Sequence, residues 1–189
     1  MSPLLRIQGV TLARGGRMLA EQLDLQLGAG ECLQLIGPNG SGKSSLIRLC
    51  AGLLAPAAGT VDRSALALAD ERAALDPELP FRRALQFWAR LSTTAERLDG
   101  ALDDFGLSAL VDVPVRLLST GQLKRAALAR VAACGAPLWL LDEPLNGLDG
   151  DGAARLTQSI DRHVADGGAV VAASHSPLAG SWRQLGLGR

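Results

Sequence analysis

The sequence predicts an α/β fold with a mostly parallel core sheet, an antiparallel β part and an inserted helical lobe. Short apolar runs alternate with helical patterns in both outer parts of the chain, as expected for parallel strands joined by crossover helices. From about residue 71 to 135 helical patterns dominate instead. In a chain of 189 residues, this organisation predicts one domain, 1–189, with its core at about 1–70 and 136–189 and its helical lobe at about 71–135.

The individual elements follow from the apolar pattern. Alternating or continuous apolar runs predict strands at 4–10, 23–27, 31–36, 59–62, 65–69, 136–144 and 169–174, the last being the final strand of the chain. Helical patterns are expected at 44–54, 82–91, 95–107 and 150–168, with Gly52 and Pro56 closing the first of them. Ser119 and Gln122 have the spacing of a capping box, so a further helix is expected to begin at Ser119.

Composition excludes several classes of protein. The 19 basic and 19 acidic residues balance, which gives no general attraction to nucleic acid, and we expect no nucleic-acid partner. The first 18 residues hold three arginines and no long apolar block, so no signal peptide is expected. No window of the sequence approaches 18 apolar residues without a charge, so no membrane span is expected. The three cysteines lack CxxC spacing and are expected to be small buried thiols: Cys32, Cys50 and Cys134.

A glycine-rich loop joins the predicted strand 31–36 to the helix after it. GPNGSGKS, residues 37–44, matches GxxxxGK[ST], whose backbone N–H groups wrap a β-phosphate at a helix N-terminus. Lys43 would reach the β- and γ-phosphate oxygens, and the Ser44 hydroxyl would bind Mg²⁺. A plain glycine turn is disfavoured because strand and helix both flank the motif. The residues expected to bind the nucleotide here are Gly37, Pro38, Asn39, Gly40, Ser41, Gly42, Lys43, Ser44 and Ser45.

Acidic and imidazole side chains follow the two buried strands of the second half. In an open parallel sheet ligands bind at the carboxyl ends of strands, so Asp142 is expected to hold Mg²⁺ and Glu143 to polarise the attacking water. His175 follows the strand 169–174 and would hydrogen-bond the γ-phosphate and that water. His163 lies in a helical pattern with polar neighbours and is expected to be solvated.

A second anion-friendly helix start lies at LSTGQ, residues 118–122. Thr120 and Gly121 add a hydroxyl and an uncovered amide to the positive end of the helix that Ser119 caps. The loop at 37–44 already wraps one β-phosphate. We therefore expect Ser119 and Gly121 to serve the nucleotide of a second copy of the chain.

These motifs in this order resemble the ATPase subunits of ABC transporters. LSTGQ is similar to their LSGGQ signature, LNGLD (145–149) to the D-loop, and His175 to the switch histidine. The resemblance implies a P-loop NTPase of ABC type that uses ATP and Mg²⁺ and forms an ATP-dependent head-to-tail homodimer. It also implies nucleotide contacts across that dimer from Ser119, Gly121, Gln122 and Asp149.

A narrower resemblance is to the heme-exporter ATPase family of cytochrome c biogenesis, CcmA. The similar blocks are 106–158, 77–88 and 166–178. The resemblance implies a peripheral protein on the cytoplasmic face of the bacterial inner membrane, partnered by integral subunits of the heme-exporter permease type. The groove for those subunits would lie near residues 70–90, where Phe81, Phe87 and Trp88 are either its floor or plain core.

The sequence departs from the ABC pattern in three places. The region 11–16 has no aromatic residue to stack on adenine, and only the guanidinium of Arg14 is available there. The Q-loop glutamine is replaced by Asp70 or Glu71, and Glu71 is therefore a further candidate to face Mg²⁺. Thr120 replaces a glycine of the signature. Alternatives to heme delivery are an ATPase of another exporter or importer, a regulatory subunit with weak hydrolysis, and a non-transport ABC protein.

Overall fold

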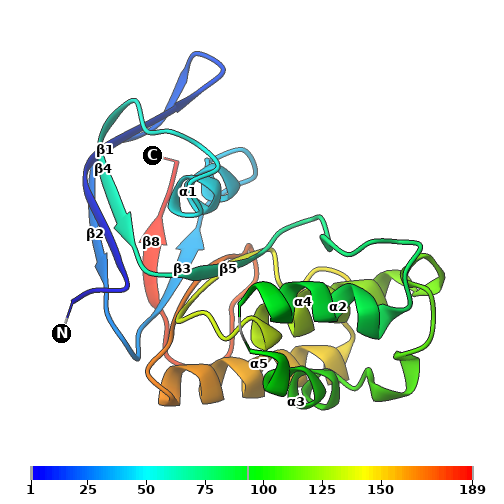
Figure 1. The fold of residues 1–189 in the computed structure, drawn as a ribbon. Coiled ribbons are helices and arrows are strands. Elements are labelled where there is room, and N and C mark those ends of the chain that lie inside the picture. The colour runs from blue at the N-terminus through cyan, green and yellow to red at the C-terminus, as the bar shows by residue number, and fades with distance from the viewer. Residues whose placement is uncertain (1, 93, 189) are drawn as a thin grey trace.

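The structure is a computed structural model that describes residues 2–92 and 94–188. Its centre is a five-stranded sheet in the order β5-β6-β7-β3-β8, and every pairing in it is parallel. The strands are β3 (Cys32–Ile36), β5 (Leu66–Ala69), β6 (Leu138–Asp142), β7 (Ala169–Ala173) and β8 (Arg183–Gly186). A separate antiparallel sheet and the helices surround this sheet (Figure 1). The predicted α/β class is confirmed.

The antiparallel sheet has the order β2-β1-β4. Its strands are β1 (Leu5–Arg14), β2 (Arg17–Leu27) and β4 (Ala58–Arg63). Gly15 and Gly16 join β1 to β2, with φ of 57° and 75° that favour glycine and suit a two-residue hairpin. Both strands extend beyond the predicted 4–10 and 23–27, because the hairpin tip is largely exposed and has no apolar periodicity to detect.

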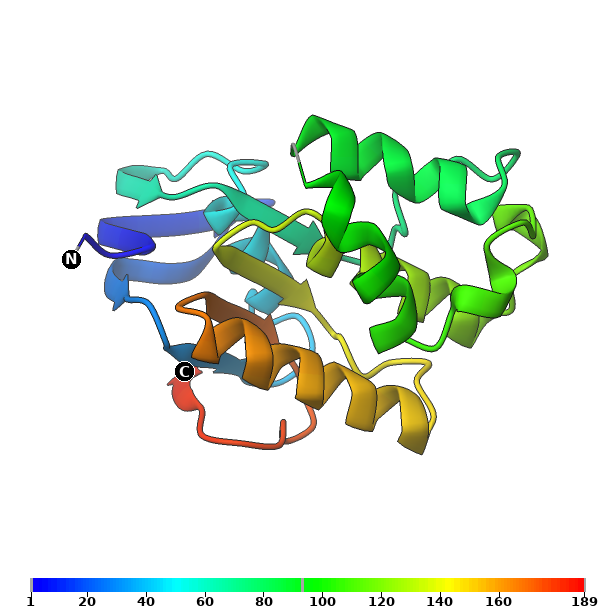
Figure 2. The ribbon, with the colours of Figure 1, turned by 60° about the horizontal axis from the view of Figure 1, so that its bottom comes forward.

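The helices are α1 (Lys43–Cys50), α2 (Phe81–Leu91), α3 (Leu98–Asp104), α4 (Thr120–Ala133) and α5 (Gly150–Ala165). Both views place α2, α3 and α4 at the opposite end of the molecule from the antiparallel sheet (Figures 1 and 2). These three helices lie between β5 and β6 in the chain. The boundaries of a lobe at about 71 and 135 stay a prediction.

The parallel sheet is covered on both faces, so the residues of β6 and β7 are buried throughout. On one face Leu140 and Val171 pack in a cluster with α1 and the antiparallel sheet. On the other face Leu141 and Ala172 pack in a cluster with residues of α2, α3, α4 and α5. The two cores fix the carboxyl ends of β6 and β7 side by side.

The structure corrects two predicted boundaries. The strand at 169–174 is not the last one, because β8 adds a parallel strand at the free edge of β3. An edge strand with mostly exposed residues has no apolar run that the sequence could show. Helix α1 ends at Cys50, where Gly52 (φ 76°) donates to Leu49 O and Leu53 donates to Arg48 O. That is a Schellman ending, which stops the helix before residue 54.

Two expectations about single side chains also change. Cys50 and Cys134 are buried free thiols as expected, but Cys32 is only partly buried. His163 is not solvated: its ring stacks on Trp139 with centroids 3.9 Å apart, and its Nε2 is buried. A side chain on a mostly polar helix face therefore reaches back to β6, a contact that helical periodicity does not show.

Candidate functional site

The glycine-rich loop, residues 37–44, connects β3 to α1 and needs glycine at three positions. Gly37, Gly40 and Gly42 have φ of 146°, 77° and 106°. A Cβ at Gly37 would lie 2.3 Å from Leu187 O and 2.8 Å from Ser41 Oγ. The loop can therefore follow this tight path only with the glycines that the sequence has.

The loop and the start of α1 place several hydrogen-bond donors close together. Gly42 is the N-cap of α1 and makes no side-chain cap bond, and the first turn contains no acidic residue. The Ser41 hydroxyl is buried and has no partner among the described residues. Lys43 is 6% exposed as a residue, and its ammonium donates to Gly37 O at 2.8 Å and to Pro38 O at 3.1 Å. A positive helix end, a buried hydroxyl and a lysine ammonium fit the phosphates of a nucleotide.

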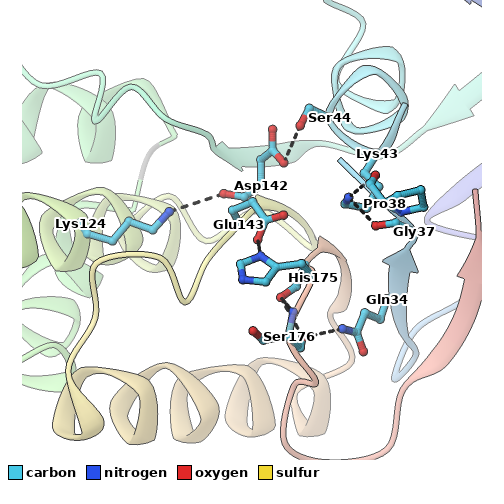
Figure 3. Close-up of polar contacts among 11 residues, drawn as sticks. Gln34, Gly37, Pro38, Lys43, Ser44, Lys124, Asp142, Glu143, His175 and Ser176 are labelled. Carbon is cyan, nitrogen blue, oxygen red and sulfur yellow. Dashed lines mark hydrogen bonds and ion pairs between the residues drawn. The ribbon is translucent and has the colours of Figure 1, made fainter. Parts of the chain in front are cut away.

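A hydrogen bond between two side chains connects the end of β6 to the start of α1. The Ser44 hydroxyl donates to Asp142 Oδ1 at 3.0 Å (Figure 3). Burial raises the pKa of the Asp142 carboxyl, and the hydrogen bond from Ser44 acts in the opposite direction. A hydroxyl and a carboxylate are ligands that Mg²⁺ accepts, and the cation takes its other ligands from water and substrate phosphates. The donor set therefore fits the Mg²⁺ that the sequence predicted.

Glu143 and His175 meet beside this pair. Glu143 directly follows β6 with φ of 45°, a left-handed conformation that is uncommon for glutamate. Its N–H donates to Ala173 O at 2.8 Å, which ties the turn to the end of β7. His175 Nδ1 lies 2.9 Å from Glu143 Oε2 (Figure 3). The two side chains predicted to handle the attacking water are thus in contact.

Gln34 is a supporting residue that the sequence analysis missed. It lies on β3, is 2% exposed, and donates through Nε2 to Ser176 O at 2.8 Å. Ser174 Oγ donates to the same carbonyl at 2.8 Å. These bonds hold the turn that carries His175 (Figure 3). The sequence signal that could have identified Gln34 is an amide side chain in the otherwise apolar strand CLQLI.

The signature segment forms the predicted capping box. Ser119 Oγ accepts from Gln122 N at 3.3 Å, and Gln122 Oε1 accepts from Ser119 N at 2.8 Å. Ser119 and Thr120 are exposed. A Cβ at Gly121 would lie 3.1 Å from Gly147 O, so the close approach at this glycine is to the 145–149 loop of its own chain.

Asp149 has a structural partner within the chain. Its Oδ1 accepts from Gly152 N at 2.8 Å and caps α5. The carboxylate thereby satisfies one of the free N–H groups at the helix start. The expected contact of Asp149 with a nucleotide across a dimer stays a prediction.

Two open cavities adjoin the Ser44–Asp142 pair. One of about 490 Å³ runs along the glycine-rich loop and includes Asn39, Gly40, Arg14 and Arg17. Arg14 Nη1 donates to Ser45 Oγ at 3.4 Å, which places a guanidinium beside the loop where the sequence lacked an aromatic residue. The other cavity, about 260 Å³, is lined by Ser44, Asp70, Glu71, Ala73, Thr120, Leu123, Lys124, Ala127, Asp142, Glu143 and Asn146. The structure thus brings Glu71 to the site, together with Lys124 and Arg17, which the sequence analysis did not place there.

The three aromatic residues proposed for a membrane groove have different positions. Phe81 is 0% exposed and belongs to the core, so its placement on a groove floor is wrong. Phe87 is 57% exposed. Trp88 is partly buried and donates through Nε1 to Ala74 O at 2.7 Å. In the part of the chain that the structure describes, none of the helices combines the length and apolar character needed to cross a bilayer.

Comparison with known proteins identifies the family of the chain. The family model described as ABC transporter matches residues 20–146. A cytochrome c biogenesis ATP-binding export protein CcmA from Sphingopyxis alaskensis is 57% identical over 95% of this chain and 93% of its own. The protein of the same name from Novosphingobium aromaticivorans is 59% identical over 90% of this chain and 87% of its own.

Solved structures support the fold. The ATP-binding subunit of an ABC transporter superposes with a TM-score of 0.80 at 24% identity, covering 91% of this chain and 79% of the other. A putative ABC transporter ATP-binding protein from Pyrococcus furiosus gives 0.84 at 20% identity, covering 96% of each chain. Together with the matched family model and the close relatives, these likenesses show that the chain belongs to the ABC transporter ATP-binding family and, within it, to the CcmA group.

Proposed function

We propose that this chain is the ATP-hydrolysing subunit of an ABC membrane complex that works in heme delivery or export for c-type cytochrome maturation. The observation that carries the proposal is the convergence of the Ser44–Asp142 and Glu143–His175 pairs beside the glycine-rich loop. The names of the close relatives support the heme-related role. The alternative is that the same site hydrolyses ATP for a different ABC exporter or importer with another cargo.

Binding would use the donors of the loop. The N–H groups of 37–44 and of the start of α1 surround the β-phosphate, and Lys43 exchanges its bonds to Gly37 O and Pro38 O for phosphate oxygens. Ser44 and Asp142 hold Mg²⁺, which neutralises charge on the phosphate oxygens when bound. Arg14 covers the base by its guanidinium plane.

Hydrolysis would use the second pair. Glu143 accepts a hydrogen bond from the attacking water and takes its proton as the oxygen bonds to the γ-phosphorus, while the bond to the leaving ADP oxygen breaks. His175 would hold the Glu143 carboxylate in place through Nδ1, and so orient the group that takes the proton. The left-handed backbone of Glu143 directs the carboxylate into this position.

The site would be completed by a second copy of the chain. The start of α4, with Ser119, Gly121 and Gln122, would offer the Gly121 amide and the Ser119 hydroxyl to the γ-phosphate bound on the partner, and Asp149 lies in the adjoining loop. Exposed apolar side chains such as Phe87 and Leu91 are available for an integral membrane subunit of the heme-exporter permease type. The chain would then act as a peripheral protein on the cytoplasmic face of the inner membrane.

The test is Glu143→Gln, which keeps the size of the side chain and removes its basicity. We expect turnover to fall at least about 100-fold, because general base catalysis contributes roughly 10²–10⁴-fold, while MgATP binding is retained. The matched control is Glu96→Gln, which makes the same change at an exposed position. Equal turnover in Glu143→Gln and the parent would refute the assignment of Glu143. Absence of hydrolysis in the parent itself would favour the regulatory alternative.

A further inference from the structure

The 260 Å³ cavity beside the glycine-rich loop is unusually acidic. Asp70 and Glu71 face it from the segment after β5, and Asp142 and Glu143 face it from the end of β6. Lys124, from the second turn of α4, is the one basic residue among those lining it. The cavity therefore combines four carboxylates with a single ammonium group.

The ammonium of Lys124 contacts a backbone carbonyl at the edge of this cavity. Its Nζ donates to Asp142 O at 3.5 Å (Figure 3). Among the ion pairs found in the described residues it has no direct carboxylate partner. Burial lowers the pKa of its ammonium, and Asp142, Glu143, Asp70 and Glu71 all act in the opposite direction. The ammonium thus shares the cavity with four carboxylates and also contacts the backbone carbonyl of Asp142.

The negative charge of the proposed substrate makes the positive charge of Lys124 important for binding. MgATP brings further negative charge to a site whose edge is already lined by carboxylates. The ABC pattern has one glutamine where this chain has Asp70 or Glu71, so this chain adds a negative charge that the pattern lacks. Like charges that line one partly desolvated cavity repel each other unless a cation shares the cavity with them.

We propose that Lys124 is a positioning residue that supplies the counter-charge for Glu71, so that MgATP can enter a cavity with an acidic Q-loop. This inference rests on the proposed function, because it concerns the nucleotide of that same site. It predicts an energetic coupling between position 124 on α4 and position 71 after β5.

The experiment measures MgATP affinity of the full chain by calorimetric titration, in a cycle of four proteins: parent, Lys124→Met, Glu71→Gln and the double variant. Lys124→Met keeps the length of the side chain and removes its charge, and we expect about a tenfold loss of affinity. Glu71→Gln in that background is expected to restore affinity to within about threefold of the parent. Lys124→Arg, which retains the charge, is expected to stay within about threefold as well.

Arg90→Met is the matched control, since it removes one exposed cation of α2 that does not line the cavity. Its affinity is expected to equal that of the parent. If Lys124→Met also equals the parent, or if Glu71→Gln restores nothing, the inference is overturned while the proposed function stands. If the parent itself binds no MgATP, both are overturned.

Discussion

Arg130 connects the helix that carries the signature segment to the segment that carries Glu71. It lies on α4 and is 5% exposed. Its Nε donates to Ala73 O at 3.1 Å and its Nη2 to Leu68 O. The guanidinium carbon lies 4.8 Å from the ring centroid of Trp88 on α2. One side chain therefore joins α4, the open edge of β5 with its following loop, and α2.

We predict that Arg130→Met destabilises the fold by about 3 kcal/mol. A hydrogen bond from a charged donor contributes roughly 1.5–3 kcal/mol and a cation–π contact roughly 0.5–1 kcal/mol, and part of this sum is offset because the buried guanidinium is no longer desolvated. The carbonyls of Leu68 and Ala73 would be left without this donor. For a chain of this size the loss corresponds to a decrease in Tm of about 6–12 °C.

The assay is urea unfolding of the full chain, with Arg90→Met as the control for loss of one arginine. Trp88→Phe keeps an aromatic ring but removes the bond to Ala74 O, and we expect it to cost about 1–2 kcal/mol. Because Arg130 and Trp88 are in contact, the double variant should lose less than the sum of the two. A loss below about 0.5 kcal/mol for Arg130→Met, as is usual for a surface substitution, would refute this reasoning.

Three further predictions concern stability and binding. Gly37→Ala places a Cβ 2.3 Å from Leu187 O, and should lower stability by more than about 2 kcal/mol and weaken MgATP binding in the same titration. Gly100→Ala, in α3 with nothing within 4 Å of the added Cβ, should instead raise the unfolding free energy by about 0.5–1 kcal/mol without changing MgATP affinity, and a loss would contradict the helix assignment. Burial lowers the pKa of His163 below its usual 6.5, so the unfolded chain binds the proton more readily and stability falls as pH decreases through 6.5. His163→Phe keeps a ring on Trp139 and should flatten the Tm between about pH 7.5 and 5.5; an unchanged slope would show that His163 does not contribute to it.

The parts of the site that could be predicted from the sequence are those that depend on short local motifs. The loop at 37–44 needs its glycines for backbone reasons, and the Ser44 hydroxyl follows directly from its place in the motif. Asp142 and Glu143 end a fully buried strand, so their position at the carboxyl edge of the sheet follows from strand length and apolar pattern. The capping box at Ser119 is likewise local, and its two bonds form as predicted.

The parts that escaped prediction depend on contacts between distant segments. Lys124 looks like an ordinary helix residue, and only the packing of α4 against the end of β6 brings it to the acidic cavity. Gln34 and His163 act through partners more than 20 residues away in the chain. Strand β8 is an exposed edge strand whose pairing with β3, and not its composition, defines it. A periodic pattern within a short stretch of sequence cannot indicate such contacts between distant residues.

The central claim is that ATP hydrolysis by this chain drives heme delivery to c-type cytochromes. The most direct measurement is deletion of its gene in the source organism, followed by heme staining of covalently bound c-type cytochromes in membrane and periplasmic fractions. We expect the stained bands to disappear and to return with the parent gene, but not with Lys43→Ala, which removes the ammonium of the glycine-rich loop. Unchanged bands after deletion, or full recovery with Lys43→Ala, would contradict it.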